Sequence, residues 1–274
     1  LKYIMSHNPR ICLQNNCALW KGGFGVLEAM LIIFGLTFGF VWSPLQRAIP
    51  TGCGSLDALL EGGLFAGGVS LVYGEAETGK SSLAVQCAVN CARMGYKSIF
   101  IDSDGTFSPK RLSQIAYYDY EKISPLIILM KPTTFKEQIT VIDHLDEYLT
   151  RKFGLIVVDT ITSLYRAELG GPKETFALNR EINRQVAFLA QIAKANKIAI
   201  LMTSQVRSVF VDDQVNIEPV AMRVLKFWAD IVLNLKHTGQ TRVIKALLEK
   251  HKEHKRSTNC YVKIERTGIR DYQH

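Results

Sequence analysis

The sequence predicts an α/β fold: a mostly parallel sheet flanked by helices, with antiparallel edge strands at the C-terminal end. From Ile49 onward, apolar runs of strand length alternate with amphipathic stretches of helix length, which is typical of a parallel sheet covered by helices. After residue 230 the pattern changes to short alternating segments joined by polar turns, as expected for antiparallel strands. With 274 residues, 47% of them hydrophobic, the chain is long enough to form one large core.

The expected elements follow from hydrophobic periodicity and from residues that start or stop helices. Strands are expected near 69–73, 97–102, 126–130, 155–160 and 198–204, and helices near 80–94, 109–117, 135–149 and 174–195. Gly95 follows the first helix, where a left-handed cap favours glycine. Ser108 is the expected N-cap of the second helix, with Pro109 in its first turn. Thr134 and Glu137 have the spacing of a capping box at the start of the third.

Residues 1–45 differ from the rest of the chain because the run 29–42 is nearly all apolar. This run is shorter than the about 18 to 20 apolar residues that a membrane-spanning helix needs. The small-residue cleavage pattern of a signal peptide is missing. Two interpretations stay open: a non-native extension, or a segment that touches a partner or a membrane. We therefore expect an atypical apolar extension at 1–45 and a folded domain at 46–274, without stable membrane association.

The composition is basic, since 33 lysines and arginines face 25 aspartates and glutamates, which gives a net charge of +8. A basic protein suits an anionic partner such as a nucleotide or a nucleic acid. The six cysteines form no C-x-x-C pair, so their spacing does not indicate a zinc site. Reduced thiols are typical of a cytoplasmic protein, and we expect that location.

The most specific motif is Gly74-x-x-x-x-Gly79-Lys80-Ser81, which follows an apolar strand and opens a helix. This is the structural context of a phosphate-binding P-loop. Its glycines let backbone N–H groups surround the phosphates, the lysine reaches the β and γ phosphates, and the serine hydroxyl ligates magnesium. The predicted cofactors are therefore ATP and Mg²⁺. The predicted cofactor-binding residues are Gly74, Glu75, Ala76, Glu77, Thr78, Gly79, Lys80, Ser81 and Ser82.

Two further strands are expected to end in acids near this loop. The all-apolar run FGLIVVD ends at Asp159, as expected for a Walker B acid that holds magnesium through water, so Ser81 and Asp159 are the predicted metal residues. The strand after the P-loop helix ends near Asp102 and Asp104, and an acid there orients the attacking water. The alternative is that both acids cap the turn that follows.

These motifs resemble the RecA superfamily, in particular the archaeal RadA and RadB recombinase group. The similar segments are PTGCGSLDALLEGGLFAGGVSLVYGEAETGKSS, FIDSDGTFSPKRL, LIVVDTITSLYR, IAILMTSQV and LEKHKEHKRSTNCYVKIERTGI. The resemblance covers 49–270 and implies a RecA-like P-loop NTPase core. RadB proteins look closer than RadA proteins, because a helix-hairpin-helix DNA-binding domain and a Phe-x-x-Ala filament segment are not evident.

The resemblance also implies roles for single residues. Lys80 and Ser81 match the phosphate and magnesium residues, and Asp159 matches the Walker B acid. Gln205 matches a polar strand-end residue that senses the γ phosphate, although it is also an ordinary place for a polar side chain. Asp104 stands where the group usually has glutamate, so its carboxylate lies about 1.5 Å further back. Because a misplacement of about 1 Å costs on the order of a hundredfold in rate, we expect a catalytic set of Asp104, Gln205 and Lys80 with slow hydrolysis.

DNA contact is expected at two places. The segment 207–227 matches the second DNA-binding loop of the group, but it lacks the usual Gly-Gly and contains three acids. The basic stretch 245–256 would neutralise phosphates with salt-dependent affinity. Its alternative interpretation is a solvated hairpin tip, which the interspersed glutamates favour. The candidate DNA-binding residues are Arg207, Lys250, Lys252, Lys255 and Arg256.

The function that the resemblance implies is an ATP-binding, DNA-binding paralogue that regulates homologous recombination and repair, with weak hydrolysis and no strand exchange of its own. The implied partners are single-stranded or branched DNA and a RadA-like recombinase or a Holliday-junction resolvase, and a homo-oligomer stays open. Two alternatives remain: an active strand-exchange recombinase, and a signalling ATPase similar to KaiC-like proteins, which share the TG-x-x-SLD-x-LL-x-GG opening. DNA binding would separate the signalling ATPase from the DNA-binding paralogue.

Overall fold

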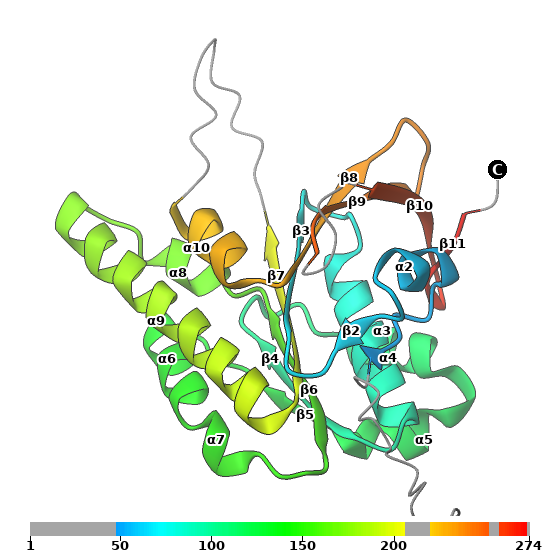
Figure 1. Cartoon of the computed structure of the whole chain (residues 1–274), viewed down its shortest axis with the longest axis horizontal. Helices are drawn as coiled ribbons and strands as arrows, with labels where there is room; N and C mark the ends of the chain where they lie inside the picture. Colours follow the sequence, from blue (N-terminus) through cyan, green and yellow to red (C-terminus); the bar gives the residue numbers. More distant parts are fainter. Residues whose placement is uncertain (1–47, 206–219, 252–257, 273–274) are drawn as a thin grey trace, which may run out of the picture. The chain divides into compact units, whose positions relative to one another are not determined.

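The computed structural model describes residues 48–205, 220–251 and 258–272, all of which belong to one compact unit, Gln46–His274. The expected N-terminal extension at 1–45 lies outside the described residues, so its nature stays an expectation. The described part is a large sheet with helices on both faces (Figure 1). Within this part, no helix is both long enough and apolar enough to cross a bilayer.

The main sheet contains nine strands in the order β11-β10-β9-β8-β3-β7-β6-β4-β5 within the described residues. Its strands are β3 (Val69–Gly74), β4 (Lys97–Asp102), β5 (Ile127–Met130), β6 (Phe153–Asp159), β7 (Ala199–Gln205), β8 (Ile231–His237), β9 (Val243–Lys250), β10 (Thr258–Glu265) and β11 (Gly268–Asp271). A separate antiparallel pair joins β1 (Ala48–Ile49) to β2 (Leu64–Phe65). The α/β class predicted from the periodicity is confirmed.

The direction of the strands agrees with the prediction in all but one strand. The central strands β3, β7, β6, β4 and β5 are parallel, and β9, β10 and β11 are antiparallel to their neighbours. The difference is β8, which is parallel to β3 on one side and antiparallel to β9 on the other. A crossover through a helix separates β7 from β8, and such crossovers connect parallel strands. The antiparallel edge therefore begins one strand later than expected.

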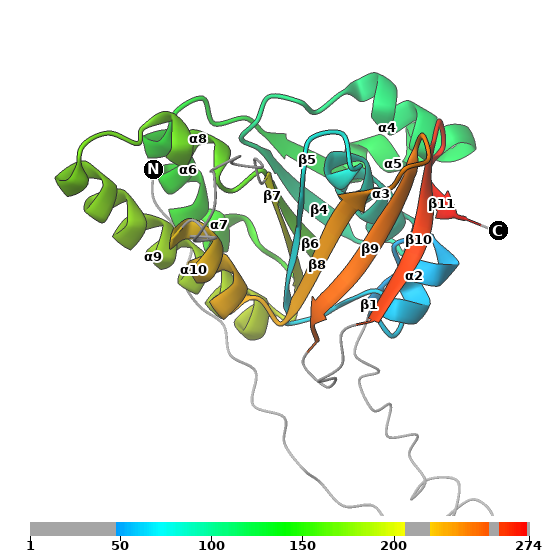
Figure 2. The same ribbon diagram turned by 90° about the horizontal axis from the view of Figure 1, so that it is seen from above.

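The helices form two layers, one on each face of the sheet (Figures 1 and 2). They are α2 (Gly54–Leu59), α3 (Lys80–Arg93), α4 (Pro109–Ala116), α5 (Tyr120–Ile123), α6 (Phe135–Asp143), α7 (Leu145–Tyr148), α8 (Ser163–Ala167), α9 (Pro172–Asn196) and α10 (Val220–Trp228), with single 3-10 turns at Tyr117–Asp119 and Ser124–Leu126. Strand residues alternate between the two cores. In β4, Phe100 packs with α3 and α4, whereas Ile99 and Ile101 pack with α6 and α9.

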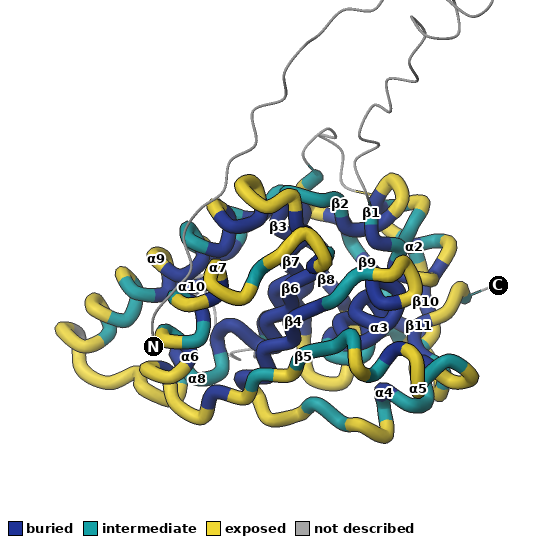
Figure 3. Tube along the Cα trace, turned by 90° about the horizontal axis from the view of Figure 1, so that it is seen from below, coloured by how far each residue is buried: buried dark blue, intermediate teal, exposed yellow. Residues whose placement is uncertain are grey.

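Figure 3 shows β3, β4, β6 and β7 buried along their length, as expected for strands covered on both faces. The helix boundaries follow the predicted signals in most places. Gly95 has a φ of +83° after α3, and the Ser108 hydroxyl accepts from the backbone N–H of Arg111 at 3.3 Å. The helix expected at 135–149 instead ends at Asp143, and a separate short helix begins at Leu145. The hydrophobic periodicity of the sequence continues through this break, so the periodicity did not predict two separate helices.

Because the central strands are parallel, their carboxyl ends all lie on one side of the sheet and their amino ends on the opposite side. At one edge the carboxyl ends of β3, β7, β4 and β6 lie together, with Gly74 paired to Gln205 and Asp102 paired to Asp159. We call this the carboxyl edge. At the other, the amino edge, β9 ends at Lys250 and β10 begins (Figure 2). Side chains at strand ends that are distant in sequence are therefore brought together at each edge.

Candidate nucleotide-binding site

The P-loop connects β3 to α3 at the carboxyl edge, and its glycines are required by close approach and by backbone conformation. A Cβ at Gly74 would lie 2.2 Å from the carbonyl oxygen of Leu235 on the neighbouring strand. Gly79 has a φ of +89° and is the N-cap of α3, a conformation that favours glycine. The loop therefore ends at a helix N-terminus whose unpaired N–H groups favour an anion.

Lys80 is buried inside the curve of this loop, with 7% of its surface exposed. Its ammonium donates to the carbonyl of Glu75 at 2.5 Å and lies 3.4 Å from the Thr78 hydroxyl. Burial lowers the pKa of Lys80, while the nearby carboxylates of Asp159 and Asp104 raise it. A buried cation held by neutral oxygen atoms is well suited to bind phosphate oxygens.

Asp159 ends β6 beside the P-loop and is 1% exposed. Its Oδ1 accepts from the Thr203 hydroxyl, and its Oδ2 has no hydrogen-bond partner in the part of the chain that the structure describes. Burial raises the pKa of Asp159, and the hydroxyls of Thr203 and Ser81 oppose this effect. The Asp159 carboxylate and the nearby Ser81 hydroxyl together form a set of hard oxygen ligands. These residues fit Mg²⁺.

The two acids after β4 have different environments. Asp102 is 1% exposed and accepts from the backbone N–H groups of Thr106 and Phe107 at 3.0 and 3.1 Å. Asp102 therefore caps the turn, as the structural alternative predicted. Asp104 is exposed, and its backbone N–H donates to the carbonyl of Asp159 at 3.3 Å. Its negative charge raises the pKa of both Lys80 and Asp159, and its backbone lies at the carboxyl edge beside Asp159.

Gln205 ends β7 opposite Gly74, so its position at the carboxyl edge agrees with the expected sensor position. Its backbone carbonyl accepts from the guanidinium of Arg166, which also donates to the Thr162 hydroxyl at 2.9 Å. The positive charge of Arg166 lowers the pKa of Lys80, so this arginine is part of the same charged cluster. Sequence reasoning missed Arg166, because only the turn of α8 back toward β7 brings it to the site.

Two side chains from outside the motif, His237 at the end of β8 and Arg111 on α4, contact the P-loop and the start of α3, and sequence reasoning missed both. The Nε2 atom of His237 lies 2.8 Å from the carbonyl oxygen of Ala76. The Nε atom of Arg111 donates to the Ser82 hydroxyl at 3.1 Å, and its Nη1 donates to the carbonyl of Arg266 at 2.7 Å. Both contacts join segments far apart in sequence. They leave no motif that a linear pattern would reveal.

Of the five candidate DNA-binding residues, one belongs to the part of the chain that the structure describes. Arg207, Lys252, Lys255 and Arg256 lie outside the described residues. Lys250 is described, and it lies opposite Val232 at the start of β8, whereas Gly74 of the P-loop lies opposite Leu235. A spacing of three strand residues is about 10 Å, and β9 runs away from the P-loop toward Lys250. Lys250 is therefore at the amino edge and is not part of the nucleotide site of its own chain.

Comparisons with known proteins agree with this geometry. The model of the Rad51 family matches residues 46–272. A protein named DNA repair and recombination protein RadB from Methanococcoides burtonii is 32% identical over 226 residues, which cover 82% of this chain and 99% of that protein. A protein of the same name from Thermococcus gammatolerans is 35% identical, covering 81% and 98%. A solved structure described as the RadB recombinase has a TM-score of 0.71 at 34% identity and covers 82% of this chain and all of that one.

Proposed function

Because this chain belongs to the Rad51 family and to its RadB group of DNA repair and recombination proteins, we propose that it is a nucleotide-gated, DNA-binding regulator of homologous recombination. The observation that carries the nucleotide part is the buried carboxylate of Asp159, which lies beside the Ser81 hydroxyl of a P-loop with Lys80 inside it. A buried carboxylate beside a hydroxyl suits a cation, and a buried ammonium at a helix N-terminus suits an anion. Magnesium and the phosphates of ATP supply both charges.

The proposed division of roles assigns the phosphates, the metal ion and the attacking water to different residues. The backbone of Gly74–Ser82 and the ammonium of Lys80 would hold the phosphates, and Ser81 and Asp159 would hold Mg²⁺. When bound, Mg²⁺ neutralises charge on the β and γ phosphate oxygens. The carboxylate of Asp104 would orient the attacking water from the end of β4. The hydrogen bond from the Asp104 backbone N–H to the Asp159 carbonyl holds the backbone from which this side chain extends.

Weak hydrolysis is part of the proposal because of the side chain at position 104. Aspartate is shorter than glutamate by one methylene group, and the side chain of Asp104 is exposed. A displaced base still permits nucleotide binding, since the phosphate ligands do not depend on it. ATP would then act mainly as a ligand that Gln205 senses at the end of β7.

The biological context is also proposed from the family. The regulator would act with a RadA-like recombinase or a Holliday-junction resolvase in the cytoplasm, without exchanging strands itself. Its DNA contacts would include Lys250 and the four basic residues at 207, 252, 255 and 256. The state of self-association is left open, because the proposal requires only one chain for the nucleotide site.

The experiment that tests this proposal measures the affinity for a fluorescent single-stranded oligonucleotide with and without Mg²⁺-ATP. The parent chain is expected to change its DNA affinity at least severalfold when Mg²⁺-ATP is added. Lys80→Ala is expected to keep the affinity seen without nucleotide and to lose the response. An equal response in the parent and in Lys80→Ala would contradict gating, and filament growth on DNA by the parent would favour a strand-exchange recombinase instead.

A further inference from the structure

A second candidate surface lies at the amino edge of the molecule, where α10 ends. Phe227 is 74% exposed, and unlike the similarly exposed Phe176 it lies next to a second aromatic side chain in sequence. Its ring lies 5.4 Å from the ring of Trp228 in an edge-to-face arrangement. The indole N–H of Trp228 donates to the Asn183 side chain on α9 at 2.9 Å. The Trp228 indole is therefore anchored to α9, and the Phe227 ring packs edge-on against it while facing solvent.

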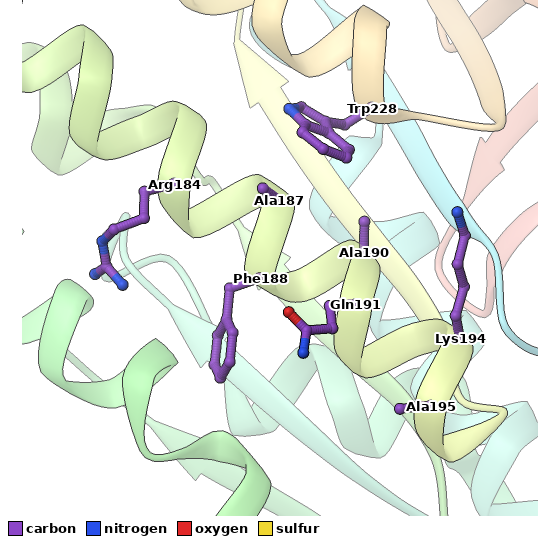
Figure 4. A pocket seen from close by; sticks show the side chains of 8 residues that line it. All are labelled: Arg184, Ala187, Phe188, Ala190, Gln191, Lys194, Ala195 and Trp228. Atoms are coloured by element: carbon purple, nitrogen blue, oxygen red, sulfur yellow. The ribbon is translucent and has the colours of Figure 1, made fainter.

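A shallow hollow of about 780 Å³ adjoins Trp228 on the exposed side of α9. Figure 4 shows Ala187 and Ala190 on the side of α9 toward the indole, with Lys194 one turn further along the helix. The lining residues are Arg184, Ala187, Phe188, Ala190, Gln191, Lys194, Ala195 and Trp228. Small side chains at the centre leave room beside the indole for a flat group. This hollow is separate from the nucleotide site described above.

The charges around these rings favour an anionic partner. Lys194 is an exposed cation that lines the hollow, and Lys250 donates from the end of β9 to the carbonyls of Lys226 and Phe227 at 3.1 and 3.3 Å. Arg184 does not add to this attraction, because Asp143 at 2.8 Å and Glu181 at 2.7 Å neutralise it.

The acids nearby are engaged as well. Glu249 pairs with Lys226 at 3.1 Å, and Asp230 accepts from the backbone N–H of Val69 at 3.0 Å. Lys194 and Lys250 are then cations that flank the aromatic pair and carry no ion pair with these four carboxylates. Lys194 lies beside the hollow that Trp228 lines, and Lys250 lies at the backbone of Phe227, so a partner that is only apolar would leave both cations unused.

We propose that Phe227, Trp228, Lys194 and Lys250 form a platform that binds single-stranded DNA, with unpaired bases stacked on the aromatic rings and phosphates near the two lysines. Aromatic rings flanked by cations are the usual means by which proteins bind single strands without sequence preference. The platform rests on the proposed DNA-binding function and adds a location at the amino edge. Since the P-loop lies at the carboxyl edge, DNA and nucleotide would bind to one chain without competing for space.

The test compares Phe227→Ala with Tyr118→Ala, which removes an 83% exposed aromatic ring remote from α10. The probes are a fluorescent oligothymidine strand, an abasic strand of equal length and a duplex. Phe227→Ala is expected to weaken binding of oligothymidine about five- to tenfold, and to leave the abasic strand and the duplex within about twofold, because only unpaired bases stack. Tyr118→Ala is expected to bind all three probes as the parent does.

The lysines are tested by the salt dependence of the same measurement. A plot of log affinity against log salt concentration has a negative slope. Lys194→Ala is expected to reduce the magnitude of this slope by about 1, whereas Phe227→Ala leaves it unchanged. Lys136→Ala, on the exposed side of α6, is the matched control and is expected to keep the parent slope. Because Phe227 and Lys194 are exposed, neither substitution is expected to lower the melting temperature by more than about 2 °C.

The outcomes separate this inference from the function on which it rests. A parent chain that binds no DNA would overturn the proposed function and the platform together. A parent that binds oligothymidine equally well after Phe227→Ala would overturn the platform alone. Equal loss of affinity for the abasic strand and for oligothymidine would also overturn it, because the ring would then not act by stacking. Loss of a protein complex with no change in DNA affinity would assign the surface to a protein partner instead.

Discussion

The two edges of the sheet differ in how their functional groups are held. At the carboxyl edge, Lys80 and Asp159 are buried, and their geometry is set by strand ends and by a helix N-terminus. At the amino edge, Phe227 and Lys250 are exposed, and side-chain contacts between α10 and β9 set their positions. Buried groups with fixed geometry suit a small ligand with defined charges. An exposed aromatic and basic surface suits a polymer that tolerates many positions.

A polar network lies between the two edges. Tyr73 directly precedes Gly74 of the P-loop, and its hydroxyl donates to Glu249 at 2.7 Å. Glu249 also accepts from Asn234 at 3.0 Å and pairs with Lys226 of α10. Burial and the Glu249 carboxylate raise the pKa of Tyr73 to about 12, so it remains a hydrogen-bond donor over the accessible pH range. Strand β3, which leads into the P-loop, is thus linked through the Glu249 side chain to α10, which carries Phe227 and Trp228.

The largest expected effect comes from removing the buried cation of the carboxyl edge. Lys80→Ala deletes charge-assisted hydrogen bonds to phosphate, which are worth about 1.5–3 kcal/mol, so ATP affinity should fall about ten- to a hundredfold. Binding of a fluorescent ATP analogue measures this loss. Lys110→Ala, an exposed lysine on α4, is the control and is expected to bind as the parent does. Equal affinity of the two variants for the ATP analogue would contradict a role of Lys80 in binding the phosphates.

The second effect would break the network between the edges. Glu249→Ala leaves the hydroxyl donor of buried Tyr73 without its acceptor, which costs about 1–3 kcal/mol of unfolding free energy. Glu249→Gln keeps an acceptor oxygen and is expected to cost less. Urea unfolding of both variants measures these costs, with exposed Glu147→Ala as the control. A loss from Glu249→Gln as large as that from Glu249→Ala would show that the ion pair with Lys226, not the acceptor, dominates.

The smallest effect concerns a contact that belongs to neither edge. Asp271 accepts from the backbone N–H groups of Ser55 and Gly54, which holds its pKa at about 2, below the ordinary 3.8. Because the folded-state pKa is depressed, the stabilisation is complete above the ordinary pKa and is lost as pH falls from about 4 to 2. The side chain is exposed, so solvent screening limits its contribution to about 1 kcal/mol.

Asp271→Asn should therefore lower the melting temperature at pH 7 by about 2–4 °C. The difference from the parent should shrink as the pH falls toward 2, because protonation then removes the same charge from the parent. Thermal unfolding followed by circular dichroism over this range measures both quantities. A difference that stays constant with pH would mean that the carboxylate charge has no part in holding α2 to β11.

The two edges also differ in how much the sequence predicts. The P-loop and the strand that ends at Asp159 are contiguous patterns, so their places at the carboxyl edge were predictable. Asp102 and Asp104 share one short segment, but only the fold separates the turn cap from the exposed acid. Arg166 reaches the site through non-local contacts, which leave no periodicity or motif.

The amino edge was less predictable for the same reason. The basic stretch near Lys250 was visible in the sequence, yet its distance from the P-loop depends on β8 being parallel to β3. The exposure of Phe227 depends on how α10 packs on α9 and β3. The sequence predicted a loop at 207–227 that includes this residue, whereas the structure has a helix from Val220 to Trp228. Periodicity identifies which residues form an element. It does not identify which of them the neighbouring elements leave uncovered.

The measurement that tests the central claim most directly is steady-state ATP turnover by the parent and by Asp104→Glu, each with and without single-stranded DNA. We predict slow turnover in the parent that DNA leaves unchanged, and faster turnover in Asp104→Glu because the added methylene brings the carboxylate toward the water it orients. Asp104→Asn is the matched control and should be no faster than the parent. Rapid, DNA-stimulated turnover in the parent would contradict the account and would indicate a motor that hydrolyses ATP as it acts on DNA.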